Sequence, residues 1–243
     1  MTNEENANKN IGQKLLNEIK TGVFAECSRL PRETELSEML GISRTHLRDI
    51  LSELEREGFI TRRHGVGTVI NRHVINVKNR MDIEMEFLDI IRQNGYEAKS
   101  EMVWIHELPA DTHLSEKLQV PEGTELIRIS RVCTADGKPA IYCEDFLEKR
   151  FVKGNYTLED LEYPIFYFLQ KFCDIHAYMD LTELHAVLAV GEVATVLQLV
   201  PGTPVLNMEE VDYDIDGKPN FYSNQYFVEG MFKHQLNLYF QIY

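Results

Sequence analysis

The stretch from residue 30 to residue 68 constrains the fold of this chain more than any other. It contains a short helix opened by Pro31, a turn at Gly41, a second helix with Ser43 as its N-cap, and a hairpin tip at residues 64–67. A serine at the N-cap accepts a hydrogen bond from a free backbone N–H of the first helical turn. Two short helices followed by a glycine-containing hairpin predict a winged helix-turn-helix, whose second helix fits the major groove of DNA.

The second of these helices carries the chemistry that reading DNA requires. Arg44 and Arg48 are four positions apart and therefore share one helix face. An arginine there can bind O6 and N7 of guanine together. Thr45 suits a phosphate oxygen, and His46 belongs to the same first turns. We predict that Arg44, Thr45, His46 and Arg48 contact DNA, although solvated helix charges would also explain the two arginines.

The basic residues around the hairpin extend this candidate interface. Arg62 and Arg63 flank the wing, and Arg32 precedes the first of the two helices. Gly65 and Gly67 lack a Cβ, so the tip can approach a narrow groove, but turn geometry alone would also explain them. We predict DNA contacts for all five.

The charge of the chain is unevenly distributed, and this affects where DNA can bind. The net charge is −14, but residues 1–70 are almost neutral, so nearly all surplus acid lies beyond them. An acidic body repels DNA except where a basic face is presented. No apolar run is long enough to span a bilayer, and the polar residues 1–10 do not resemble a signal peptide. We therefore expect a cytoplasmic protein without membrane contact.

The remainder of the chain reads as an internal duplication. The turn Asp136-Gly137-Lys138-Pro139 recurs at residues 216–219, and the segment at residues 120–126 is similar to the one at 200–206. An Asp-Gly turn between two apolar runs is a strong hairpin signal. Each half reads as helix, V-P-x-G-T turn, strand, D-G-K-P turn and strand. Strands are predicted at 101–107, 125–134, 140–147, 175–184, 205–213 and 220–228, and helices at 114–118, 164–173 and 192–199.

These patterns predict an α+β protein with a winged helix-turn-helix at residues 1–70, a linker at 71–81 and a second domain at 82–243, opened by a helix at 82–93. The tail at 237–241 alternates like a final strand, and equally resembles a protease recognition sequence used in cloning.

Residues 9–70 resemble the DNA-binding domain of the GntR superfamily of bacterial transcription regulators. Arg32 and His46 depart from the family pattern, which usually has serine and threonine there, so the operator can differ from the common one. The matching residues are Leu30, Pro31, Glu33, Leu36, Gly41, Ser43, Arg44, Arg48, Leu54, Gly58, Gly65, Gly67 and Thr68.

Residues 82–236 resemble the UTRA domain of the HutC-type subfamily. The resemblance implies a chorismate-lyase-like, mainly antiparallel sheet that binds small effectors and dimerises. It is carried by Arg131 before the first D-G-K-P turn, Glu144, Leu184, the V-P-G-T-P-V-L segment, and residues 212–219 followed by Tyr222-Ser223.

The resemblance suggests effector contacts at Arg131, Glu144, Ser223, Tyr226 and Phe227. Cys133 stands where the family often has a second arginine, and Phe221 where it often has glutamate. Without the second arginine, the site has one group fewer that could bind an anion through two hydrogen bonds. A sugar phosphate is therefore less favoured as the effector, and a compound with an apolar part is more favoured. Two simpler interpretations remain. Arg131 and Glu144 can form a structural ion pair, and Tyr226 or Phe227 can belong to the core.

Neither a metal site nor a cofactor is predicted. Cys27, Cys133, Cys143 and Cys173 are isolated, and the histidines lack ligand spacing. We expect a transcription regulator, specifically a homodimeric repressor that binds an inverted-repeat operator and a small-molecule effector. The alternatives are a lyase-like enzyme, for which no acid–base pair or nucleophile is evident, and a DNA-binding module controlled by a protein partner.

Overall fold

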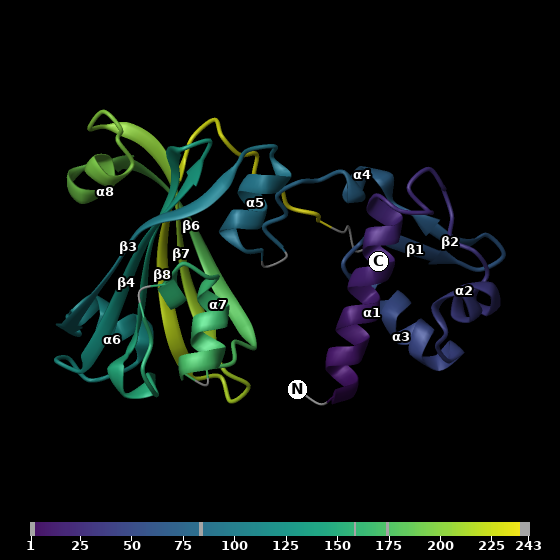
Figure 1. The fold of residues 1–243 in the computed structure, drawn as a ribbon, viewed down its shortest axis with the longest axis horizontal. Coiled ribbons are helices and arrows are strands. Elements are labelled where there is room, and N and C mark those ends of the chain that lie inside the picture. Colours follow the sequence, from purple (N-terminus) through teal and green to yellow (C-terminus); the bar gives the residue numbers. More distant parts are fainter. Residues whose placement is uncertain (1–2, 83–84, 158, 174, 239–243) are drawn as a thin grey trace. The chain divides into compact units, whose positions relative to one another are not determined.

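The computed structural model of the chain describes residues 3–82, 85–157, 159–173 and 175–238. These residues form two units, labelled by element in Figure 1. Unit 1 comprises residues 3–82 and 234–238, and unit 2 comprises residues 85–233. No helix of the described residues is long and apolar enough to cross a membrane.

Unit 1 is a set of short helices with one small hairpin. Its core is formed by α1, α2, α3 and the hairpin, and α3 buries Leu47, Ile50, Leu51 and Leu54 at the i, i+3, i+4, i+7 spacing of one helix face. The elements in order are α1 (Asn3–Lys20), α2 (Glu33–Leu40), α3 (Arg44–Arg56), β1 (Ile60–Arg63), β2 (Gly67–Ile70) and α4 (Arg72–Ile75).

The junction between α2 and α3 forms as the sequence predicts. Gly41 follows α2 with a φ of 66°, a left-handed conformation that glycine adopts without steric cost. The Ser43 side chain accepts a hydrogen bond of 3.2 Å from the backbone N–H of His46. The helix-turn-helix and its wing, β1 paired antiparallel with β2, are thereby confirmed.

The segment expected to be a linker, residues 71–81, is structured at its start. It contains α4, whose Val74 and Ile75 are buried in the core of unit 1. The Arg72 guanidinium donates to the backbone oxygens of Ile19, Phe24 and Cys27, with distances of 2.7 Å to Ile19 and 2.7 Å to Cys27. Arg72 therefore fixes the end of α1 and the loop that follows it.

Residues 79–81 also pair with the end of the chain. The backbone N–H of Met81 donates to the oxygen of Gln235, and the N–H of Gln235 donates to the oxygen of Asn79, both at 2.9 Å. Most of the predicted final strand at 237–241 lies outside the described residues.

Unit 2 is built on one antiparallel sheet in the order β3-β4-β5-β8-β7-β6. The predicted duplication corresponds to two similar halves, each a strand, a helix, a strand, a D-G-K-P turn and a strand. The predicted α+β class is therefore confirmed. The sheet elements and the two inserted helices are β3 (Ala98–Pro109), α6 (Thr112–Leu118), β4 (Glu125–Ala135), β5 (Lys138–Glu148), β6 (Met179–Ala189), α8 (Gly191–Val196), β7 (Thr203–Tyr213) and β8 (Pro219–Val228).

Some boundaries differ from the sequence prediction. The first helix, α5 (Phe87–Gln93), begins after its N-cap Glu86 rather than at residue 82. Strand β6 extends to Ala189 rather than to Leu184, because it pairs along its whole length with β7. The remaining helical turns are η1 (Lys149–Phe151), η2 (Glu159–Leu161), α7 (Ile165–Phe168) and η3 (Leu169–Cys173), the last of which is a π-helical turn.

Each face of the sheet is covered by helices, as Figure 1 shows. On what we call the α7 face, Phe168 of α7 packs with Ile129 and Phe221, and Phe87 of α5 contacts Phe227. On the opposite face, called the α6 face, α6 packs on a cluster from β4, β5, β7 and β8, and α8 packs beside it. Successive side chains of a strand point to opposite faces, so this division decides which polar residues can meet.

We expect Arg72→Met to destabilise unit 1 by about 2–3 kcal/mol, because buried carbonyls would lose a charged donor. Chemical denaturation of the full chain, followed by far-UV circular dichroism, measures this loss. The one tryptophan, Trp104, belongs to unit 2, so its fluorescence reports on unit 2 alone. The control is Arg56→Met, which removes an exposed arginine from the end of α3. Equal denaturation midpoints for the two variants would contradict the role assigned to Arg72.

Candidate functional site

The N-terminal half of α3 exposes most of the residues predicted to contact DNA. Arg44, Thr45 and Arg48 are exposed and lie outside the buried stripe that contains Leu47. His46 is half-buried, and its Nε2 is a buried atom without a hydrogen-bond partner among the described residues. Three of the four α3 candidates therefore share an accessible surface, and His46 lies at its edge.

The arginines of this region differ in how they are held. Arg48 Nε lies 2.8 Å from Glu33 Oε2, and Arg62 Nε lies 2.7 Å from Glu55 Oε2. In the described parts of the chain, no ion pair involves Arg44 or Arg63. Arg48 would have to exchange Glu33 for DNA, but exposed pairs of this kind are worth only about 0–1 kcal/mol, so the exchange costs little.

The wing tip requires glycine for its backbone conformation. Gly65 and Gly67 have φ values of 75° and 95°, and a Cβ built on either would meet no atom within 4 Å. Arg29, which sequence reasoning did not single out, donates from Nη1 to the oxygen of Val66 at 3.2 Å and supports the tip. Arg32 is exposed at the start of α2.

The five residues suggested as effector contacts lie on two faces of the sheet. Ser223 pairs with Asp145, and Asn224 pairs with Glu144, so each pair points to one face. Arg131, Ser223 and Phe227 belong to the α7 face, whereas Glu144 and Tyr226 belong to the α6 face. A single site can therefore take its sheet contacts from only one of these groups.

A chain of buried polar side chains runs across the α7 face. Arg131 Nη2 donates to Asp145 Oδ2 at 2.9 Å, and their side chains are 5% and 1% exposed. Ser223 Oγ donates to the other carboxylate oxygen of Asp145 at 2.7 Å. Gln225 Nε2 donates to Ser223 Oγ at 3.2 Å and also to Glu210. The partner of Arg131 is thus Asp145 rather than Glu144, and the charge of Arg131 is already compensated.

Two further carboxyl groups adjoin this chain. Burial raises the pKa of Glu86 to about 7, although the Arg131 charge opposes the shift. Burial likewise raises the pKa of Glu210 to about 7, against its hydrogen bond from Gln225. Arg131 Nε is a buried donor without a partner among the described residues. The α7 face therefore holds more acidic than basic groups.

The α6 face carries a separate network. Arg128 forms ion pairs with Glu144 and, at 3.0 Å, with Glu192. Tyr142 accepts a hydrogen bond from Arg128 at 2.9 Å and stacks on Tyr226 with ring centroids 6.1 Å apart. Arg128 was not among the predicted site residues, yet it is the group that neutralises Glu144.

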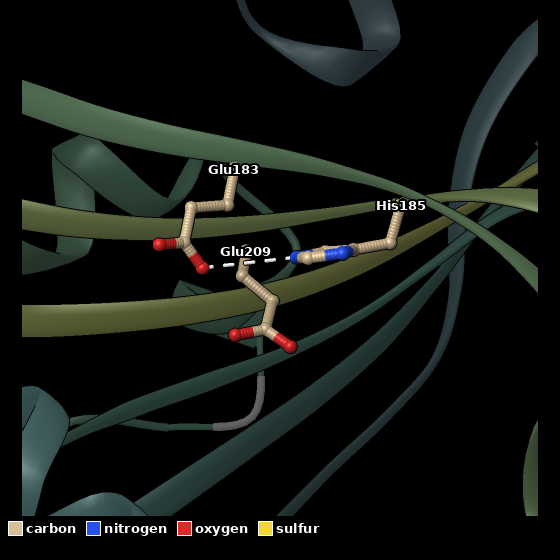
Figure 2. A group of neighbouring side chains, drawn as sticks. All are labelled: Glu183, His185 and Glu209. Atoms are coloured by element: carbon tan, nitrogen blue, oxygen red, sulfur yellow. Dashed lines mark ion pairs between the residues drawn. The ribbon is translucent and has the colours of Figure 1, made fainter.

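The sheet also brings together one set of metal-type donors that sequence spacing could not reveal. Glu183, His185 and Glu209 come from β6 and β7, and their ligand atoms lie within 4.8 Å of one another (Figure 2). Lys117 Nζ lies 3.2 Å from Glu183 and 2.8 Å from Glu209. The Lys117 ammonium therefore compensates these two carboxylates.

The fold thus combines a winged helix-turn-helix with a sheet domain that buries a polar network, the build of a ligand-responsive DNA-binding regulator. Comparison with protein families agrees with both parts. The family described as bacterial regulatory proteins, gntR family, matches residues 7–70, and the UTRA domain matches residues 93–233. The chain belongs to the GntR family of transcription regulators, HutC subfamily, with a C-terminal UTRA domain. It is therefore a regulator that binds DNA through its helix-turn-helix, and not an enzyme.

Relatives of known sequence extend over most of the chain. An uncharacterized HTH-type transcriptional regulator, RB1450 of Rhizobium meliloti, is 27% identical over 220 residues, which cover 90% of this chain and 89% of the relative. A probable fructoselysine utilization operon transcriptional repressor of Escherichia coli K12 is 25% identical over 217 residues, covering 86% and 85% of the two chains.

Solved structures share the fold. The possible transcriptional regulator YydK of Bacillus subtilis superposes with a TM-score of 0.75 at 18% identity, covering 94% of this chain and 99% of that one. PhnF of Mycobacterium smegmatis gives a TM-score of 0.59 at 20% identity, covering 87% and 92%.

We expect Arg44→Ala to weaken operator binding by about 1–3 kcal/mol and to relax base preference, because an arginine that binds a guanine edge discriminates by that amount. Fluorescence anisotropy with operator and with scrambled DNA measures both effects. Arg56→Ala removes the same charge from the far end of α3 and serves as the control. Equal operator affinity in the two variants would overturn the assignment of α3 as the recognition helix.

The raised pKa values of Glu86 and Glu210 predict how the stability of unit 2 depends on pH. Both carboxyls keep their protons up to about pH 7 when folded, but release them near their ordinary value of 4.5 when unfolded. The folded state therefore binds more protons between these values, and stability falls as the pH rises from about 5 to about 8.

Thermal unfolding followed by Trp104 fluorescence at pH 5 and pH 8 tests this dependence. The double variant Glu86→Gln/Glu210→Gln should show a smaller difference between the two midpoints. Glu229→Gln removes an exposed carboxyl from the same unit and should leave the difference unchanged. A double variant with the wild-type difference would argue against proton uptake at these two groups.

Proposed function

We propose that this protein is a homodimeric repressor that binds an inverted-repeat operator and is released by a small metabolite bound on the α7 face of its UTRA domain. The observation that carries the DNA part is the capped start of α3. Ser43 caps this helix, and Arg44, Thr45 and Arg48 are exposed on its first turns. A helix N-terminus with exposed arginines is the arrangement that reads base edges in helix-turn-helix proteins. Arg32, Arg62, Arg63 and the wing tip supply contacts to the backbone and groove.

The small size of the DNA-binding unit supports the proposed dimeric state. One winged helix presents few cations, and residues 1–70 carry almost no net charge. A single half-site is therefore bound weakly, because phosphate neutralisation supplies much of the affinity. Two linked units raise affinity through effective concentration and favour a symmetric operator. The repressing sign is supported by a relative of this chain that is named a repressor.

The chemistry of the α7 face narrows the effector. Arg131 is paired with buried Asp145, so the charge that would hold a phosphate is already neutralised. Asp145 already accepts two hydrogen bonds, so the groups left for a ligand are the carboxyls of Glu86 and Glu210, which accept when they are ionised, and polar side chains such as Gln225. We expect a metabolite rich in hydrogen-bond donors, an amine or a polyhydroxyl compound, with an apolar part against the aromatic side chains of this face.

Ligand control then obeys thermodynamic linkage. An effector can shift the operator equilibrium only by its differential affinity for the free and DNA-bound protein, and couplings of about 1–3 kcal/mol are typical. Operator DNA must weaken effector binding by the same factor by which the effector weakens operator binding.

The test begins with selection of operator sequences from random DNA by the purified full-length protein. We expect an inverted repeat, and much weaker binding to a single half-site. A panel of primary amines, polyols and sugar phosphates is then screened for release of that operator. Calorimetry with the active compound, with and without operator, checks reciprocity.

A pair of neighbouring residues on opposite faces locates the effector. Ser223→Ala alters the α7 face, and Asn224→Ala alters the α6 face. We expect Ser223→Ala to weaken effector binding roughly 10-fold, as loss of one buried hydrogen bond does, and Asn224→Ala to have little effect. The reverse order would move the effector site to the α6 face, and release by sugar phosphates alone would refute the proposed chemistry.

A further inference from the structure

The two edge strands of the unit 2 sheet differ in a way that bears on assembly. Strand β3 is interrupted by a register shift between Glu101 and Trp104, and its exposed side chains include Lys99, Glu101 and Glu107. Charges and bulges are the features by which natural proteins protect a sheet edge from pairing. The β3 edge is therefore protected.

The β6 edge has no register shift, although it too exposes ionisable side chains, Glu183 and His185. All 11 of its residues pair with β7 without a register shift, so its backbone is regular along the whole strand. It exposes large apolar side chains, with 57% of Leu181, 46% of Leu184 and 59% of Leu188 accessible. In the described parts of the chain, no strand pairs with its outer edge. A long, regular and apolar edge of this kind is a template for pairing with another strand.

The side chains of β6 show which strand fits. In a symmetric antiparallel pair, residues that oppose each other point to the same face of the sheet. Glu183 and His185 share one face of β6, as Figure 2 shows, and Leu184 lies between them on the other face. If two copies of β6 pair about a two-fold axis at Leu184, Glu183 lies opposite the partner's His185, and His185 lies opposite the partner's Glu183.

The same register matches the apolar residues, because Leu181 lies opposite the partner's Val187 and Leu184 lies opposite the partner's Leu184. An axis at Glu183 or at His185 would instead oppose two identical ionisable groups. Like charges directly opposite each other are destabilising, whereas opposite charges and apolar pairs stabilise a sheet. Strand β6 is therefore complementary to itself in one register.

We propose that two copies of this chain dimerise by antiparallel pairing of their β6 strands about a two-fold axis at Leu184, which joins the two sheets into one. The inference rests on the homodimer of the proposed function and names its interface. It requires no movement of the sheet, because the outer edge of β6 is already extended. Such an isologous contact is closed by its own symmetry, so it stops at the dimer.

Sedimentation of the full-length protein tests the interface. Leu184→Lys places two ammonium groups opposite each other at the axis, and we expect the dimer dissociation constant to rise roughly 30-fold or more, as for loss of a central contact residue. Ile215→Lys introduces the same change at a residue in the β7–β8 turn that is 77% exposed and should leave the dimer intact. Trp104 fluorescence confirms that both variants fold.

Charge reversal tests the register. Glu183→Arg alone should weaken the dimer, because the new guanidinium cannot accept a hydrogen bond from the imidazole of the partner's His185. Adding His185→Glu places a carboxylate opposite the new guanidinium of each partner and should recover the dimer. Failure of the double variant to recover it would refute this register.

Cysteine cross-linking gives an independent reading. Opposed residues of an antiparallel pair have Cα atoms about 4.5–5.5 Å apart, within disulfide reach. Leu184→Cys should therefore form an interchain disulfide on oxidation. Leu188→Cys is the control on the same face of the strand. With the axis at Leu184, the two copies of residue 188 lie eight residues apart along the paired strands, roughly 27 Å at 3.4 Å per residue, so they should not cross-link.

The outcomes separate this inference from the proposed function. A wild-type dimer that persists in Leu184→Lys and does not cross-link through Leu184→Cys would refute the β6 interface while leaving the homodimer in place. A wild-type protein that is monomeric at micromolar concentration would refute both. If the protein is monomeric, the exposed edge of β6 would be explained by pairing with a strand of another protein.

Discussion

The two-residue period of the unit 2 sheet is the constraint on which the rest of that unit depends. In β4, β5 and β8 it sends Arg131, Asp145 and Ser223 to one face, and Arg128, Glu144 and Asn224 to the other. The polar side chains on each face form a separate network of hydrogen bonds and ion pairs, covered by the helices on that face. Because buried charges are tolerated only when they are paired, neither network can lose a member cheaply. A shift of one strand by one residue would send its side chains to the opposite faces and break both networks.

Charge compensation within the α7 face bears on the effector that we propose for it. Asp145 accepts from both Arg131 and Ser223, which leaves Arg131 without net charge to offer a ligand. Glu86 and Glu210 are buried beside this pair and hold protons at a higher pH than ordinary carboxyls. In the effector site that we propose, these two carboxyls would accept hydrogen bonds from a ligand when they are ionised and donate them when they are protonated.

Unit 1 shows how one short helix serves two purposes. The inner stripe of α3 holds the core together through Leu47, Ile50, Leu51 and Leu54, and the outer side of its first turns exposes Arg44, Thr45 and Arg48. The Ser43 cap fixes where the helix begins and so where the exposed side chains lie. Arg72 ties the following segment to the end of α1 through backbone oxygens, which keeps the core of unit 1 closed around α3.

The sequence by itself determined the local features, because each depends on neighbours in the chain. The cap at Ser43, the turn at Gly41, the buried stripe of α3 and the two D-G-K-P hairpins follow from spacing and from the conformations that single residues allow. Only the tertiary structure decided which residues meet across strands. The pairing of Arg131 with Asp145 and of Glu144 with Arg128 depends on strand order and register, as does the proximity of Glu183, His185 and Glu209. These are set by contacts between residues far apart in the chain, and no local pattern encodes them.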